Sequence, residues 1–356
     1  MREIDGSHVS RLFFGARNTI TGHAKRQPES PFCPQNNLPL CKSSKNSEND
    51  DLVSASTIQM AGAAVADMAS AQVQTRQLAQ SHYENFSVVS LLLPRRLRQD
   101  FSNVYAFCRV ADDLGDETGD RDESLRLLAD FRAQTLDCFA GHAQTPVFVA
   151  LSQTIERHNL PPQPFLDLID AFEQDQRVPR YQTYDQLLDY CRRSANPVGR
   201  LVLYLCGYRD TQRLELSDCT CTALQLANFW QDVRRDILER DRIYIPRETM
   251  DQFSVTEEQI RRGECNDNFH ALLRFEVDRT AGLFDRGSAL LPLLRPAVRL
   301  QISLFGKGGR AVLSAIRRQN YDTLSHRPAL SKFQKGGLVC STLIAFAGRL
   351  LTGGQR

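Results

Sequence analysis

Two carboxylates one helical turn apart stand near the end of the segment YAFCRVADDLGDE, which begins at Tyr105. Asp112 and Asp116 are four residues apart, so their side chains are neighbours on an α-helix. Tyr105 and Arg109 fall on the same stripe, within about 60° of both, and Asp113 lies beside it. The rest of the helix is mostly apolar, which is typical of a buried helix whose polar stripe faces a ligand or a polar cavity. The alternative is a solvated helix end, because the following loop is also acidic.

The segment LANFWQDVRRDI repeats this pattern further along the chain. Asn228, Asp232 and Asp236 share a strip about 80° wide, and apolar side chains fill the opposite arc. If two such faces meet inside a helical bundle, several carboxylates surround one cavity and repel one another. Divalent cations would relieve that repulsion. Oxygen ligands suit Mg²⁺, and bound Mg²⁺ recruits a polyphosphate. We therefore predict a magnesium and diphosphate site; ordinary surface pairing of these acids with Arg234 and Arg235 is the alternative.

The composition is that of a globular protein, with 42% hydrophobic and 24% charged residues and a net charge of +2. This balance gives no indication of nucleic-acid binding. No apolar run is long enough to span a bilayer, and no secretory signal opens the chain. The ten cysteines have no paired metal-ligand spacing, so we expect them to be reduced. These features predict a cytoplasmic protein, and a peripheral contact with the inner membrane through the apolar stretch 338–348 stays open.

Helical periodicity dominates the chain from about residue 80. Residues 1–75 contain a stretch rich in Pro, Ser, Asn and charge, and we predict a disordered N-terminal extension there. Residues 76–356 are predicted to form one all-α domain of roughly ten helices around a single core. The predicted helices are 97–114, 122–139, 146–158, 164–174, 183–206, 214–239, 267–294, 296–320 and 333–351.

These motifs resemble the squalene and phytoene synthase family over about residues 80–325. The resemblance rests on the two acidic motifs in order, on RIYIP after the second, and on YCRRSANPVGRLVL between them. It implies an all-α isoprenoid-synthase fold, a helical bundle around a central cavity. It also implies Mg²⁺-dependent condensation or rearrangement of prenyl diphosphates.

The resemblance and the residue types together give the candidate site residues. The expected metal ligands are Asp112, Asp113, Asp116, Asp232 and Asp236. The expected substrate-binding residues are Asn85, Phe86, Arg109, Asn228 and Arg242. The candidates for the chemical step, including the handling of a water, are Tyr105, Arg109, Tyr190, Asn196 and Gln231.

Three departures from the usual family motifs indicate a branch. Asn85 replaces a serine, Asn196–Pro197 replaces part of a Val-Ala-Gly element, and Gln231 replaces an arginine. Together they most resemble bacterial hydroxysqualene synthases. That branch converts presqualene diphosphate and water to hydroxysqualene, and a separate reductase then forms squalene for hopanoids.

Two other functions stay open at this stage. One is a synthase that joins two prenyl diphosphates to presqualene diphosphate, squalene or phytoene. The other is a catalytically inactive helical assembly factor that kept the scaffold. Because no glycine-rich dinucleotide fingerprint is present, we do not expect NADPH as a cofactor.

Overall fold

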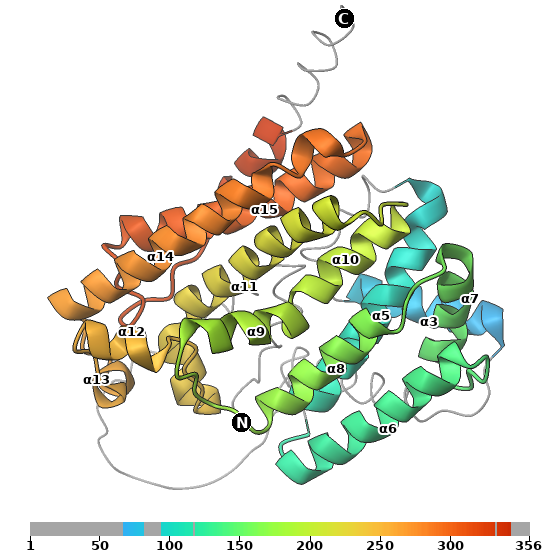
Figure 1. Cartoon of the computed structure of the whole chain (residues 1–356), viewed down its shortest axis with the longest axis horizontal. Helices are drawn as coiled ribbons and strands as arrows, with labels where there is room; N and C mark the ends of the chain where they lie inside the picture. Colours follow the sequence, from blue (N-terminus) through green and yellow to red (C-terminus); the bar gives the residue numbers. More distant parts are fainter. Residues whose placement is uncertain (1–66, 82–93, 117, 332, 343–356) are drawn as a thin grey trace, which may run out of the picture.

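The computed structural model describes residues 67–81, 94–116, 118–331 and 333–342, and helices make up most of them (Figure 1). Among these residues the one β feature is an isolated bridge between Arg180 and Ile243. The all-α prediction is therefore confirmed. The α-helices are α3 (Met68–Ser81), α5 (Arg98–Asp116), α6 (Arg121–Phe139), α7 (Pro146–His158), α8 (Gln163–Asp175), α9 (Tyr184–Ser194), α10 (Asn196–Leu205), α11 (Thr211–Arg240), α12 (Arg247–Gln252), α13 (Glu257–Arg262), α14 (Asp267–Ser288) and α15 (Pro296–Arg318).

Most predicted helices match observed ones, but the predicted helix 183–206 is two helices. The chain breaks at Ala195, whose φ of −120° and ψ of −48° leave the helical region. Pro197 explains the break, because proline lacks an N–H and its ring clashes with the preceding helical turn. The predicted helix 267–294 likewise ends early, at Ser288, and Pro292 follows in a short 3₁₀ turn.

The predicted boundary between extension and domain, at residues 75 and 76, is wrong. Helix α3 begins at Met68 and packs Ala71 and Leu78 into the protein. The buried Thr75 hydroxyl donates a hydrogen bond of 2.7 Å to the Asn103 side chain on α5. The sequence did not predict α3 because most of its residues are polar or small, so it has little apolar periodicity. Residues 1–66 lie outside the described part of the chain, so the disorder predicted for them stays a prediction.

A truncated protein that begins at Met60 is expected to fold and to keep wild-type turnover, because α3 is intact. A protein that begins at Gln80 loses the buried Leu78 and the bond from Thr75, and we expect it to lose at least about 3 kcal/mol of stability. Urea unfolding of both proteins measures the difference. Equal stability of the two truncations would show that α3 does not belong to the domain.

Helix α11, with 30 residues, runs through the middle of the bundle (Figure 1). It packs against α14 and α15 on one side and against α9 and α10 on another. One apolar cluster gathers side chains of α5 to α8 and α10, and a second gathers those of α9, α11, α14 and α15. The polar faces of α5 and α11 therefore lie within the protein, between two packed halves.

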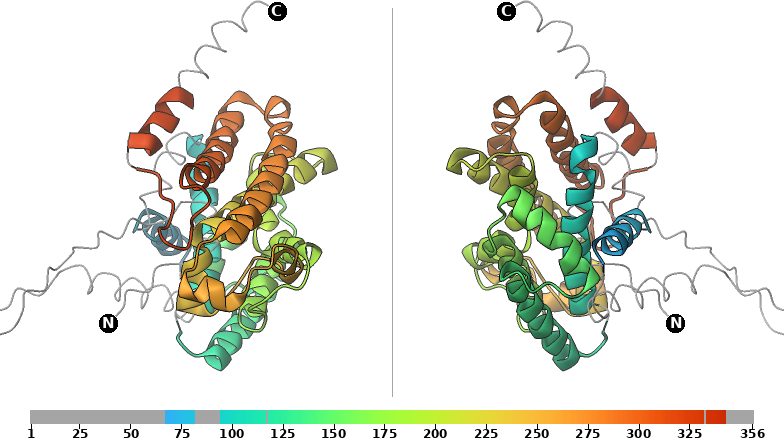
Figure 2. Two further views of the ribbon diagram at one scale, coloured as in Figure 1. Left: turned by 90° about the vertical axis from the view of Figure 1, so that its left-hand side faces the viewer. Right: turned by 90° about the vertical axis from the view of Figure 1, so that its right-hand side faces the viewer.

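The C-terminal part of the described chain is a helix over residues 333–342, which lies beside α15 in Figure 2. The remainder of the predicted helix 333–351 lies outside the described residues. None of the described helices is both long enough and apolar enough to cross a membrane.

Candidate active site

The acidic face of α5 is buried. Asp112 and Asp113 are each 1% exposed, and Tyr105 and Arg109 are each 5% exposed. The alternative of a solvated helix end is therefore wrong for this segment. Arg109 supplies the nearest positive charge, with its Nη2 atom 2.5 Å from Asp113 and its Nη1 atom 3.7 Å from Asp112.

The acidic face of α11 is buried as well. Asp232 is 1% and Asp236 is 2% exposed, and Asn228 on the same face is partly buried. Arg327, from the segment after α15, pairs with Asp232 through two guanidinium nitrogens. Asp232 is fully buried and Arg327 is 26% exposed, whereas Arg234 donates to the Leu324 carbonyl and Arg235 pairs with Glu239. The acidic face of α11 is therefore not the solvated surface that the alternative required.

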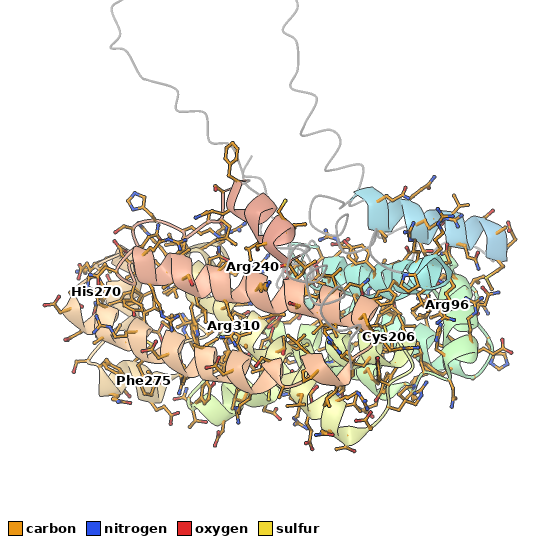
Figure 3. All side chains as sticks on the ribbon, turned by 90° about the horizontal axis from the view of Figure 1, so that it is seen from above. Arg96, Cys206, Arg240, His270, Phe275 and Arg310 are labelled. Atoms are coloured by element: carbon orange, nitrogen blue, oxygen red, sulfur yellow. The ribbon has the colours of Figure 1, made fainter. Side chains whose placement is uncertain are left out.

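Two arginines at the end of α11 connect its acidic face to that of α5. Arg240 Nη1 lies 3.2 Å and Arg242 Nη1 lies 3.7 Å from the carboxylate of Asp116. The turn that brings Arg242 back depends on Asp241, which adopts the left-handed conformation with φ of 50°. The Arg242 N–H then donates to the Asp236 carbonyl at 3.0 Å. Figure 3 marks Arg240 near the middle of the view, with His270 toward one end and Cys206 and then Arg96 toward the other.

Asp175, the last residue of α8, adds a second carboxylate to the group formed by Asp116, Arg240 and Arg242. The sequence pattern did not predict this residue. The Tyr190 hydroxyl donates to its carboxylate at 2.8 Å. Arg242 donates to the Asp175 carbonyl at 2.9 Å and lies 3.8 Å from the carboxylate. Burial raises the pKa of Asp175 to about 6, although the positive charge of Arg242 opposes the shift. The site thus holds a carboxyl that titrates near neutral pH.

Tyr190 sits in an aromatic stack. Its ring lies 6.2 Å from that of Phe229 and 5.9 Å from that of Tyr244, and the last two rings stack at 3.7 Å. Burial raises the pKa of the Tyr190 hydroxyl well above its ordinary value. The hydroxyl therefore stays protonated and acts as a hydrogen-bond donor.

An apolar cavity of about 50 Å³ opens between α10, α11 and α15. It is lined by Ala195, Val198, Gly199, Val202, Ser217, Thr220, Cys221, Leu224, Ile302 and Phe305. A Cβ atom at Gly199 would lie 2.4 Å from Cys221 Sγ, so α10 and α11 approach closely there. The cavity is far smaller than a thirty-carbon prenyl chain.

The cavity and the acidic residues lie along one face of α11. Intervals of three or four residues place successive side chains on a single helical face. That face carries Ser217, Cys221, Gln225, Asn228, Asp232 and Asp236. The site therefore has an apolar end and a charged end, joined along α11.

Of the remaining predicted residues, two are buried and hydrogen-bonded, and two lie outside the described part of the chain. Asn196 is 7% exposed and accepts a 2.9 Å hydrogen bond from the Thr222 hydroxyl. Gln231 lies about 100° around the helix from Asp232 and donates to the Pro328 carbonyl. Asn85 and Phe86 lie outside the described residues.

The buried carboxylates fit the predicted magnesium ions in donor type, because Mg²⁺ prefers oxygen ligands. Arginines pair with several of these carboxylates in the structure. Over the described ranges no group of three or more His, Cys, Asp or Glu side chains is arranged to hold a metal ion. Magnesium binding is therefore a prediction that rests on residue type and burial.

Comparison with known proteins identifies the family. The model of the squalene/phytoene synthase family matches residues 79–334. The chain belongs to this family. The protein is 47% identical to the squalene synthase HpnC from Alicyclobacillus acidocaldarius, whose crystal structure superposes with a TM-score of 0.69 over 74% of this chain and 99% of that one. The predicted isoprenoid-synthase fold is thus confirmed.

Curated relatives of this family member include hydroxysqualene synthases and phytoene synthases. The hydroxysqualene synthase of Zymomonas mobilis is 31% identical over 76% of this chain and 89% of its own. The 15-cis-phytoene synthase of Synechococcus elongatus is 28% identical over 79% of this chain and 94% of its own. The family is therefore established, and the reaction within it is a separate question.

Proposed function

We propose that this protein converts presqualene diphosphate and water to hydroxysqualene and diphosphate, with Mg²⁺ as its cofactor. The observation that carries the proposal is the two-ended buried site, in which charged groups of α5 and α11 adjoin an apolar cavity. A prenyl diphosphate has the same two parts. The similarity to squalene synthase HpnC and to hydroxysqualene synthases favours this branch.

The charged end is suited to receive the leaving diphosphate. Asp112, Asp116, Asp232 and Asp236 would hold Mg²⁺, which neutralises the negative charge that develops on the leaving group. Arg109 and Arg242 supply fixed positive charges there, and such preorganised charges stabilise a developing anion in a water-poor site.

The apolar end is suited to protect the carbocation that remains. Burial keeps bulk water away until one water reaches the reacting carbon. The face of Tyr190 is a candidate for stabilising the positive charge through its ring quadrupole. The proposed step needs no reductant, so NADPH is not expected to be required.

The second candidate is a synthase that joins two prenyl diphosphates, which the similarity to phytoene synthases favours. Purified protein is incubated with presqualene diphosphate and, separately, with farnesyl diphosphate. Mg²⁺ is present, NADPH is absent, and products are identified by mass spectrometry. Hydroxysqualene from presqualene diphosphate alone supports the proposal. Farnesyl diphosphate converted mainly to presqualene diphosphate or to a phytoene-type hydrocarbon would overturn it, while family and fold would stand.

A further inference from the structure

Two buried polar side chains lie where the charged end meets the apolar cavity. Gln225 is 0% exposed, and within the described part of the chain neither end of its amide has a hydrogen-bond partner. Ser194 is 1% exposed, and its hydroxyl likewise has no hydrogen-bond partner among the described residues. Each buried polar group left without a partner costs about 1–3 kcal/mol. Stability of the fold therefore does not explain why these groups are polar.

Gln225 belongs to the face of α11 that carries the acidic residues. It precedes Asp232 by seven residues, which is two turns or about 10 Å along the helix. Its neighbours Leu224 and Cys221 line the apolar cavity. The amide is thus placed between the charged end and the cavity.

Ser194, on α9, also lies between the charged end and the cavity. It follows Tyr190 by four residues, so the two side chains share a helical face, and the Tyr190 hydroxyl contacts Asp175 at the charged end. The next residue, Ala195, lines the cavity. The 2.9 Å bond from Thr222 to Asn196 ties the start of α10 to α11 one turn before Gln225.

We propose that Gln225 and Ser194 position the water that captures the carbocation, an inference that rests on the proposed function. The cation forms beside the departed diphosphate, and its rearranged form is to be captured at the junction of the charged and apolar ends, where these two side chains lie. An amide oxygen or a hydroxyl that accepts a hydrogen bond from water leaves a water lone pair to face the carbon.

The step balances without an oxidant or reductant. The carbon–oxygen bond to the diphosphate breaks, and its electron pair leaves with the diphosphate. The cyclopropylcarbinyl cation that remains rearranges. When the water oxygen forms a new carbon–oxygen bond to it, a carbon–carbon bond of the three-membered ring breaks and its electron pair completes a new carbon–carbon double bond. The surplus proton of the water passes to the released diphosphate. Without a positioned water, the cation loses a proton from a neighbouring carbon and gives a hydrocarbon instead.

The test compares wild type with Gln225→Leu and Ser194→Ala on presqualene diphosphate, with Mg²⁺ and without NADPH. The measured quantities are the ratio of alcohol to hydrocarbon and the rate of diphosphate release. Each variant is expected to lower the ratio by about tenfold, because one hydrogen bond to the water is lost. Diphosphate release is expected to stay within about threefold, because neither side chain is proposed to bind the leaving group.

Gln259→Leu is the matched control, since Gln259 is also buried but donates to the Glu264 carbonyl and to Asn266. It is expected to lose stability and to keep the wild-type product ratio, whereas Gln225→Leu is expected to keep its stability. If wild type makes alcohol and both site variants keep its product ratio, the inference is overturned whatever their rates. If wild type makes no alcohol, the proposed function itself fails.

Discussion

Replacing Asp232 by alanine is expected to reduce turnover of presqualene diphosphate by about a thousandfold. Asp232 is buried on the acidic face of α11, and we propose it as a magnesium ligand. Loss of one preorganised group that stabilises developing charge typically costs two to three powers of ten in rate. Asp112→Ala, on helix α5, is expected to have an effect of similar size. Diphosphate release at saturating Mg²⁺ measures both variants.

Asp278→Ala is a suitable control, because Asp278 is 58% exposed and pairs with Arg317 on the surface. It is expected to turn over at the wild-type rate. Far-UV circular dichroism checks that all three variants keep their helical content. Wild-type turnover in Asp112→Ala or Asp232→Ala would show that the corresponding acidic face does not serve the reaction.

Arg242→Leu is expected to destabilise the protein by about 3 kcal/mol at pH 8, because it leaves buried carboxylates without a counter-charge. The side chain is 10% exposed and lies near both Asp116 and Asp175. Arg240 still pairs with Asp116, so most of the lost stability is expected to come from Asp175, which would lack a counter-charge. Urea unfolding measures the change, and Arg242→Leu combined with Asp175→Asn is expected to recover part of it.

The effect of Arg242→Leu is also expected to depend on pH. Burial raises the pKa of Asp175 to about 6, above its ordinary value of 3.8, so the folded state binds the proton more tightly than the unfolded chain. Stability due to this group is therefore present at low pH and is lost as pH rises through about 6. Removing Arg242 raises this pKa further. The loss of stability caused by Arg242→Leu should shrink as the pH falls from 8 to 5, because a protonated Asp175 needs no counter-charge.

Arg247→Leu is the comparison for this variant, since Arg247 is 54% exposed and pairs with the exposed Asp251. We expect a change below about 0.5 kcal/mol. An Arg242→Leu deficit no larger than that of Arg247→Leu, or one independent of pH, would contradict the role assigned to the charged end.

Much of the fold was predictable because apolar periodicity marks the long helices. Residues 146–158 were predicted as a helix and form α7 with the same bounds. Helix α3 was missed because it is polar along much of its length and is held partly by the Thr75 hydrogen bond. The break at Ala195 was missed because the apolar pattern continues across it, although Pro197 was a visible signal.

The site was predictable where residues of one kind repeat on a helical face. The spacing of Asp112 with Asp116, and of Asn228 with Asp232, gave both acidic faces. Asp175 and Arg327 reach the site from a helix end and from an irregular segment, so no period could reveal them. Gln225 did lie on the predicted face of α11. That its amide has no hydrogen-bond partner among the described residues is visible only when the surrounding helices are in place.

The origin of the alcohol oxygen is the most direct test of the proposed reaction. Purified protein is given presqualene diphosphate and Mg²⁺ in ¹⁸O-water, without NADPH, and the product is analysed by mass spectrometry. We expect hydroxysqualene that carries one heavy oxygen, because water attacks carbon after the diphosphate has left with its own oxygen. An alcohol without heavy oxygen would mean that water attacked phosphorus instead. Such a product, or a hydrocarbon as the main product, would contradict the proposed reaction.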